Sequence, residues 1–229
     1  MIRIIACSAL CALVLVSVPQ DTCADKVHRH GLTICSIIIV EFTNGRVPFE
    51  AAKEMSKAIA LAGNRHFGKV TCGDMWLYLA IAQVESNFRS NVVNHFNCRG
   101  MFQIHAPSWA HKFGFDHKDL LNPRVNAHVG IAVYKYYLER YGNMALALSA
   151  FNSDHPRAAE NYVRLVLHMR GKIARRYGAL YNTFMEDEPP ISQAAKPLDG
   201  NAPKPLPEPA EKAPSPTPAP LAGTLLGGA

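Results

Sequence analysis

The sequence contains no His-Glu-x-x-His and no paired Cys-x-x-Cys, two spacings that place side chains around a metal ion. Its ten histidines and six cysteines are scattered along the 229 residues instead. No segment repeats at a fixed interval, and the length suits one enzyme-sized domain. We therefore expect a single main domain that uses neither a metal nor another cofactor.

The sequence also has no apolar run of the ~20 residues that a membrane-spanning helix needs. The longest run, Ile4–Val18, follows Arg3 and precedes the small-residue segment Thr22-Cys23-Ala24, an order typical of a cleaved signal peptide. A permanent anchor is disfavoured by the shortness of the run, and a lipid anchor on Cys23 by the polar approach Asp21-Thr22. We predict that residues 1–24 are a signal peptide and that the protein is periplasmic or secreted.

Removal of the signal would leave few cysteines. Cys35, Cys72 and Cys98 remain, an odd number in an oxidising compartment. A Cys72–Cys98 disulfide would bracket the segment around Glu85, but three residues permit three pairings. Three buried thiols are an equally good interpretation.

Aromatic residues are absent from the segment 189–220, which holds eleven of the sixteen prolines. Such a segment cannot bury enough surface to fold, so we predict a disordered proline-rich tail from residue 185 to 229. A solvated tail is the simplest reading, and a strand that docks on a partner's aromatic groove is the alternative.

The charge divides at the same boundary. Residues 25–184 carry 20 Lys and Arg against 11 Asp and Glu, a net charge of +9, whereas the tail has three Lys against six acids. In an exported protein a basic folded part suits an anionic polymer such as cell wall, and we expect no nucleic-acid partner.

The folded part has mostly helical periodicity. Only Leu32–Phe42, short and β-branched, could be either a strand or a buried helix. We predict an all-α domain of roughly 150 residues packed around one buried helix, with an N-terminal segment and helix over 25–70. Helices are expected from Phe49 to Gly63, from Asp74 to Glu85, from about Pro107, over Val125–Arg140, over Met144–Phe151 and from Pro156 to Gly171.

A lone acid, Glu85, ends the predicted central helix WLYLAIAQVESNF. The helix is apolar nearly all round, which is typical of an interior helix. Burial and the negative end of the helix dipole both disfavour the carboxylate and raise its pKa. A carboxylic acid still protonated near neutral pH can protonate the leaving oxygen of a glycosidic bond.

The plain alternative is a helix-terminal Glu whose side chain simply reaches solvent or forms an ion pair with Arg89, four residues on. Neighbouring segments favour a site instead. In NCRGMFQIHAPSW, Gln103 could hydrogen-bond a sugar beside Met101 and Phe102. In SAFNSD, Asn152 is either a helix C-cap or a sugar-contacting amide.

Four motifs in order resemble the family 1 lytic transglycosylases, of the soluble-lytic-transglycosylase type with a lysozyme-like fold. Their catalytic domain is similar to the chain from about Gly73 to Leu167, within a predicted domain over 71–184. The motifs are Glu85-Ser86, Gly100-Met101-Phe102-Gln103-Ile104, Ala150-Phe151-Asn152 and Tyr162-Val163. A stretch containing Asn126 and Gly130 also resembles the family.

The resemblance implies that Glu85 is the catalytic acid and base. It also implies a peptidoglycan substrate and a set of substrate-binding residues: Ser86, Met101, Gln103, Phe151, Asn152 and Tyr162. Two positions depart from the pattern, because Phe102 stands where the family usually has Met and Phe151 where it usually has Tyr. A tyrosine hydroxyl is therefore missing at position 151.

No Asp or Glu occurs between Ser86 and Phe115. A hydrolysing glycosidase normally needs a second carboxylate across the bond, so Glu85 is expected to work alone unless the fold returns Asp116 or Asp119. The nucleophile would then be the 6-hydroxyl of muramic acid, giving a 1,6-anhydro ring.

The alternatives are a hydrolytic muramidase and a non-catalytic wall-binding component. Size and tail resemble enzymes that open the wall for a secretion, conjugation or pilus complex.

Overall fold

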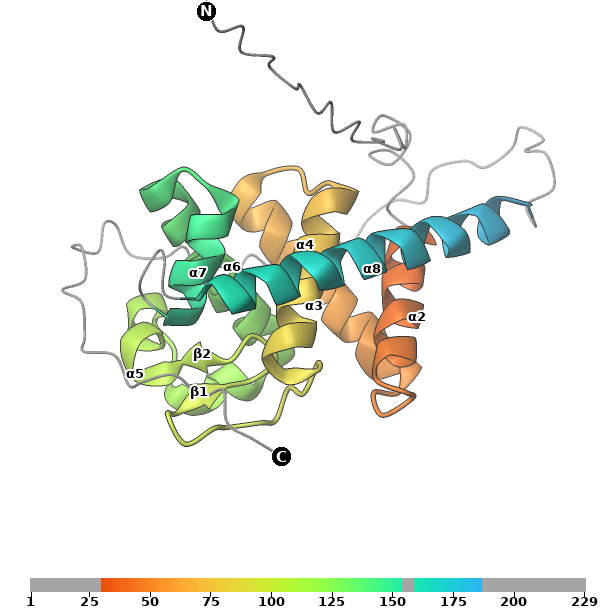
Figure 1. Ribbon diagram of the computed structural model, residues 1–229. Helices are drawn as coiled ribbons and strands as arrows, with labels where there is room; N and C mark the ends of the chain where they lie inside the picture. The colour runs from red at the N-terminus through yellow and green to blue at the C-terminus, as the bar shows by residue number, and fades with distance from the viewer. Residues whose placement is uncertain (1–29, 154–158, 187–229) are drawn as a thin grey trace, which may run out of the picture.

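The computed structural model describes residues 30–153 and 159–186. Helices dominate this part of the chain, and a two-stranded antiparallel ribbon with the register Cys98↔His105 completes it (Figure 1). The elements in chain order are α2 (Leu32–Phe42), α3 (Phe49–Phe67), α4 (Cys72–Ser86), β1 (Cys98–Arg99), β2 (Ile104–His105), α5 (Ala106–Trp109), η2 (His111–Phe113), η3 (His117–Leu121), α6 (Pro123–Tyr141), α7 (Met144–Ser153) and α8 (Glu160–Glu186).

The helix α4 is the buried central helix, which confirms the predicted fold class. Thr71 caps its N-terminus in a capping box with Asp74, whose side chain accepts the Thr71 N–H at 2.9 Å. Residues on every side of α4 are buried, among them Leu77, Leu79 and Ile81. The long helix α8 lies across α4 and also packs on α2 (Figure 1). This packing fixes the C-terminal end of α4, which carries Glu85.

Two helices run past the glycines that were expected to end them. The predicted end of α3 at Gly63 is wrong, because a Cβ there would lie 2.5 Å from Val70 and the glycine instead lets neighbouring segments approach closely. The predicted end at Gly171 is also wrong. One helical glycine costs only about 1 kcal/mol, and Ile173 and Tyr177 beyond it are buried. Burying these two side chains stabilises the helix by more than the glycine costs.

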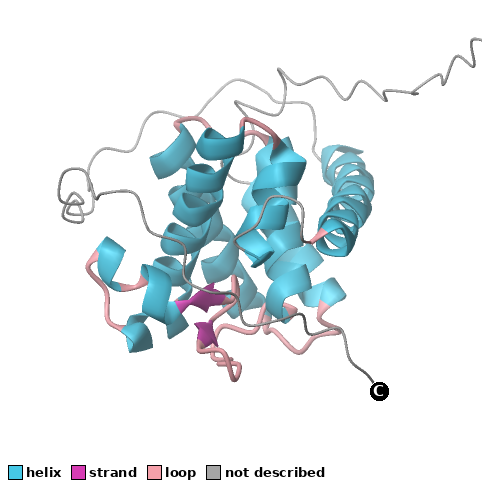
Figure 2. Ribbon diagram, turned by 60° about the vertical axis from the view of Figure 1, so that its left-hand side comes forward, coloured by secondary structure: helices cyan, strands magenta, loops and turns pink. Residues whose placement is uncertain are grey.

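The segment Leu32–Phe42, left open between strand and helix, is the helix α2. It packs against α3 and α8, and Ile34, Ile38 and Ile39 are buried. β-Branched residues are tolerated there because packing decides the structure of a buried segment. The ribbon β1–β2 lies in the lower part of the molecule beside loops (Figure 2).

The possible Cys72–Cys98 disulfide is wrong, and so is the alternative of three buried thiols. Cys72 is disulfide-bonded, but Cys98 carries a thiol, as does the buried Cys35. Cys72 opens α4 and lies 4.0 Å from the Tyr177 hydroxyl, whereas Cys98 lies beyond the other end of that helix. A 15-residue helix is roughly 22 Å long, far more than the ~7 Å between the Cα atoms of a disulfide.

Three predictions fall outside the described residues: the signal peptide over 1–24, the helix start at Pro156, and the predicted tail 185–229 from residue 187 onward. Residues 185 and 186 belong to α8, so the predicted start of the tail is wrong by two residues. The domain boundaries at 25 and 71 stay predictions. Within the described part, no helix has the length and apolarity to cross a membrane. The same residues hold no group of three or more His, Cys, Asp or Glu side chains suited to a metal ion.

Candidate functional site

The site is built at the C-terminal end of α4. Glu85 occupies the last turn, and the chain then reverses through two successive residues in the left-handed region, Asn87 (φ 53°) and Phe88 (φ 57°). Such a conformation is costly for a residue with a side chain, and it persists only where its surroundings fix it. Phe88 is fully buried, which anchors the reversal. The carboxylate is therefore held beside a rigid turn.

Burial sets the protonation of Glu85. The residue keeps some contact with solvent, yet protein atoms surround the carboxyl group and raise its pKa from 4.5 to about 7. The Tyr162 hydroxyl opposes this shift and lies close enough to lower the pKa, although the two groups do not meet hydrogen-bond geometry. A group with a pKa near 7 can give and take a proton at neutral pH.

An ion pair between Glu85 and Arg89 is absent from the described structure. The Arg89 Nε–H donates instead to the Ser86 carbonyl at 2.9 Å, and the Arg89 backbone N–H donates to Ser86 Oγ at 3.0 Å. Arg89 thus caps the helix end and leaves the acid uncompensated. This removes the ion pair as an explanation of the acid.

Ser86 joins α4 to the loop that carries the second motif. Its buried hydroxyl donates to the Met101 carbonyl at 2.9 Å. Met101 and its neighbour Phe102 are both buried. The predicted site residues Ser86 and Met101 are therefore brought together, and in this structure they hold the scaffold behind Glu85.

Asn126 fixes that loop from the other side. Its Nδ2 donates to the Arg99 and Leu120 carbonyls, each at 2.8 Å, and its Oδ1 accepts the Phe102 N–H at 2.8 Å. The side chain is fully buried. The sequence did not reveal this role, although a single amide on the apolar face of a predicted helix was a usable signal.

Gln103 stands at the end of the loop in a left-handed conformation (φ 46°) and is half-buried. Its Nε2 donates to the Gly100 carbonyl at 2.9 Å, which orients the amide. Among the described residues no donor reaches its Oε1, so that oxygen is available to a ligand hydroxyl or amide. Gly100 must be glycine, because a Cβ would meet the Leu120 carbonyl at 2.4 Å.

The last motifs reach the site from α7 and α8. Tyr162, predicted to bind substrate, is buried in the first turns of α8 beside Glu85. Asn152 is not a residue beyond the helix but lies in the last turn of α7 and is exposed, while Phe151 packs half-buried against the core. Neither makes a hydrogen bond to another predicted site residue within the described part of the chain.

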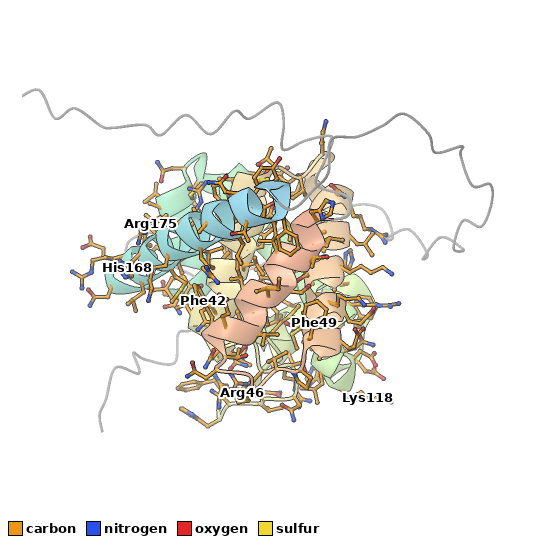
Figure 3. All side chains as sticks on the ribbon, turned by 90° about the vertical axis from the view of Figure 1, so that its right-hand side faces the viewer. Phe42, Arg46, Phe49, Lys118, His168 and Arg175 are labelled. Carbon is orange, nitrogen blue, oxygen red and sulfur yellow. The ribbon has the colours of Figure 1, made fainter. Side chains whose placement is uncertain are left out.

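One further residue comes from outside the motifs. Arg46, in the turn between α2 and α3, donates from Nη2 to the Asn87 carbonyl at 2.5 Å. The side chain is exposed at the edge of the molecule (Figure 3). It braces the reversal after Glu85 from a segment 41 residues away. No sequence pattern could have revealed a contact that depends on the packing of α2.

The two acids proposed as a second carboxylate serve a structural purpose. The Asp116 N–H donates to Asp119 Oδ2 at 2.9 Å at the start of η3, and Lys118 pairs with Asp116 at 3.8 Å on the surface. Neither acid acts on the pKa of Glu85, which burial and Tyr162 set. The site thus has one acid of raised pKa, one tyrosine beside it and one oriented amide.

Comparison with known families agrees with the geometry. Residues 73–162 match the family model described as the transglycosylase SLT domain, whose members are lytic transglycosylases. The matched segment begins with α4 and ends at Tyr162. No curated protein matches the chain. The recognised resemblance and the enzyme class are thereby confirmed: the chain carries a lyase domain that acts on peptidoglycan.

Proposed function

We propose that this chain, whose residues 73–162 are a transglycosylase SLT domain, cleaves the bond between N-acetylmuramic acid and N-acetylglucosamine with Glu85 as its only acid and base. The observation that carries the proposal is the pKa of Glu85, which burial raises to about 7. One group can then be protonated in the first step and ionised in the second.

Protonated Glu85 first donates its proton to the bridging oxygen, and the bond from that oxygen to C1 of muramic acid breaks. The resulting carboxylate faces a positive charge that develops on C1 and its ring oxygen. It then accepts the proton of the 6-hydroxyl, whose oxygen bonds to C1. The product is a 1,6-anhydro ring, no water is consumed, and Glu85 regains its proton.

The surroundings of Glu85 support this one-acid mechanism. Asp116 and Asp119 are engaged with each other's backbone and with Lys118 at the surface. The Tyr162 hydroxyl, which lowers the pKa of Glu85, stabilises its anionic form and so supports the second step. The oriented amide of Gln103 offers an oxygen acceptor for substrate N–H or O–H groups.

The sequence supports an exported setting for the reaction. A signal peptide over 1–24 would deliver the protein to the periplasm or outside, where its substrate lies. A small exported enzyme with a proline-rich tail suits local opening of the wall for a secretion, conjugation or pilus complex, with the tail as the docking segment.

Digestion of purified sacculi by the full chain tests the proposal. Wild type should release disaccharide products lighter by one water than hydrolysis products, as weighed by mass spectrometry. Glu85→Gln should lose at least about 1000-fold in rate, because the amide can neither donate nor accept the proton. Glu139→Gln, an exposed acid paired with Lys135, is the matched control and should keep full activity.

Two outcomes would replace the proposal. Products with the mass expected for hydrolysis would identify a muramidase that activates water. If neither wild type nor Glu85→Gln digests sacculi, but both bind them, the protein is a non-catalytic wall-binding component.

A further inference from the structure

A row of basic side chains runs along the outer face of α8. Arg164, His168, Lys172 and Arg175 are all exposed. They follow one another at steps of three or four residues, which places them on one side of a helix. His168 and Arg175 mark this edge in Figure 3. These four residues are called the α8 basic row.

The positive charges of the row are not balanced within the described residues. Arg164 donates to the neutral amide of Asn161 at 3.0 Å, and neither Lys172 nor Arg175 forms an ion pair there. The adjacent Arg176, in contrast, is held by Glu41 at 2.7 Å. Lys172 and Arg175 are like charges three residues apart on one side of the helix, so an anionic partner would relieve the repulsion between them.

A shallow surface hollow lies beside the row, where the end of α2 meets α8. Phe42 and Ala179 line it with apolar atoms, and Lys172, Arg175 and Arg176 provide the cations around them. Figure 3 shows Phe42 at the end of α2, next to α8. A carboxylate carried on a short aliphatic chain matches this combination of charges and apolar surface.

The row is part of the same helix as the site. Tyr162 faces Glu85 from the buried side of α8, and Arg164 begins the row two residues later on the exposed side. From Arg164 to Arg175 the helix rises roughly 16 Å. The row therefore lies on the face of α8 away from the acid, where it can meet only groups of the polymer that are distant from the reacting bond.

We propose that the α8 basic row and its hollow bind the carboxylates of the peptide stems of peptidoglycan, beside the glycan strand that Glu85 cleaves. This inference rests on the proposed function, since it assumes the same substrate. It assigns the row to holding the polymer and not to the chemistry.

The test compares two triple variants of the full chain. The row variant removes the three permanent charges of the row by combining Arg164→Gln, Lys172→Gln and Arg175→Gln. Lys53→Gln, Lys57→Gln and Lys118→Gln remove the same charge from exposed positions elsewhere. The row variant should bind sacculi about tenfold more weakly, with a raised KM, an unchanged kcat and a flatter dependence on salt. The control variant should stay near wild type.

Equal weakening in both triple variants would overturn the proposal, because net charge alone would then explain the binding. Wild-type affinity in the row variant would overturn it as well. If the row variant no longer binds vesicles of anionic phospholipid but still binds sacculi like wild type, the row binds a membrane surface instead.

Glycan strands stripped of their stem peptides separate this inference from the proposed function. On stripped strands the row variant and wild type should show the same KM, because no stem carboxylates remain. If wild type yields no anhydro products from intact or stripped strands, the proposed function fails. If it yields them and the row variant has a wild-type KM on intact strands, only the inference about the row fails.

Discussion

The ring of Phe102 lies against the backbone of Gly130, so close that a Cβ at position 130 would come within 2.7 Å of the ring. Phe102 is buried, and its backbone N–H is held by Asn126 one turn earlier on the same helix, α6. Phenylalanine stands here where the resembling family usually has methionine. The glycine on α6 makes room for the larger ring, so the exchange leaves the loop that carries Gln103 in place.

Gly130→Ala is expected to destabilise the protein by about 1–3 kcal/mol, because the added methyl group overpacks a filled interior. In a Phe102→Met background the same change should cost clearly less, since a flexible thioether can move aside. Urea denaturation of the four proteins in a double-mutant cycle measures the difference. Identical costs in both backgrounds would contradict the proposed accommodation.

Tyr162→Phe should shift the pH dependence of activity. The Tyr162 hydroxyl lowers the pKa of Glu85, so its removal should let that pKa rise further above about 7. The limb of the kcat profile on which Glu85 loses its proton should then move to higher pH. Turnover of sacculi from pH 5 to 9 measures the shift, and an unmoved profile would exclude an action of Tyr162 on Glu85.

Glu85→Gln should stabilise the fold at alkaline pH. The folded pKa of Glu85 is raised to about 7 from 4.5, so the native state holds its proton more tightly than the unfolded chain. Wild type therefore loses stability as pH rises from about 4.5 to 7, by at most about 3 kcal/mol. Thermal unfolding should show the variant gaining over wild type at pH 8 and not at pH 4. A constant difference across this range would refute the linkage.

A pair of stacked histidines should make the protein sensitive to acid. His66 and His128 join α3 to α6, with 2.9 Å between His66 Nε2 and His128 Nδ1. Burial lowers both pKa values, that of His128 to about 4, with further lowering from Arg65. Stability that is present above pH 6.5 is therefore lost as the pH falls toward 4.

His128→Gln should reduce this loss, because glutamine keeps a hydrogen-bonding group without a proton to gain. Melting temperatures of wild type and variant at pH 7 and pH 4.5 measure the effect, which we expect to be roughly 1–2 kcal/mol. The Glu85 contribution runs in the opposite direction over part of this range, so the comparison is best made in the Glu85→Gln background. If acid lowers the melting temperatures of wild type and variant equally, the histidine pair is not the source of the acid sensitivity.

Local patterns predicted most helices but misjudged several of their ends. Gly63 and Gly171 are stop signals in isolation, yet each lies within a helix because the turns beyond it are packed. Periodicity could not choose between strand and helix for Leu32–Phe42, since a buried segment shows apolar residues on every side in either form. The choice depended on neighbours that are distant in the sequence.

The site shows the same division. Glu85, Ser86, Gln103 and Tyr162 could be identified because each falls in a motif of fixed spacing, and the structure brings Tyr162 to Glu85 and Ser86 to Met101. The roles of other residues arise only in the folded molecule. Asn126 acts through three backbone contacts from separate segments, and Arg46 reaches Asn87 across the packing of α2.

The sequence by itself determined the buried central helix, the lone acid at its end and the family whose motifs surround that acid, because apolar periodicity and short motifs are local properties. Only the tertiary structure decided that Arg89 caps the helix and leaves Glu85 without an ion pair, and that Cys98 keeps its thiol while Cys72 is disulfide-bonded. It also decided that α8 turns Tyr162 toward the acid and a basic row toward solvent. Each of these depends on distances between segments, and those distances are set by packing.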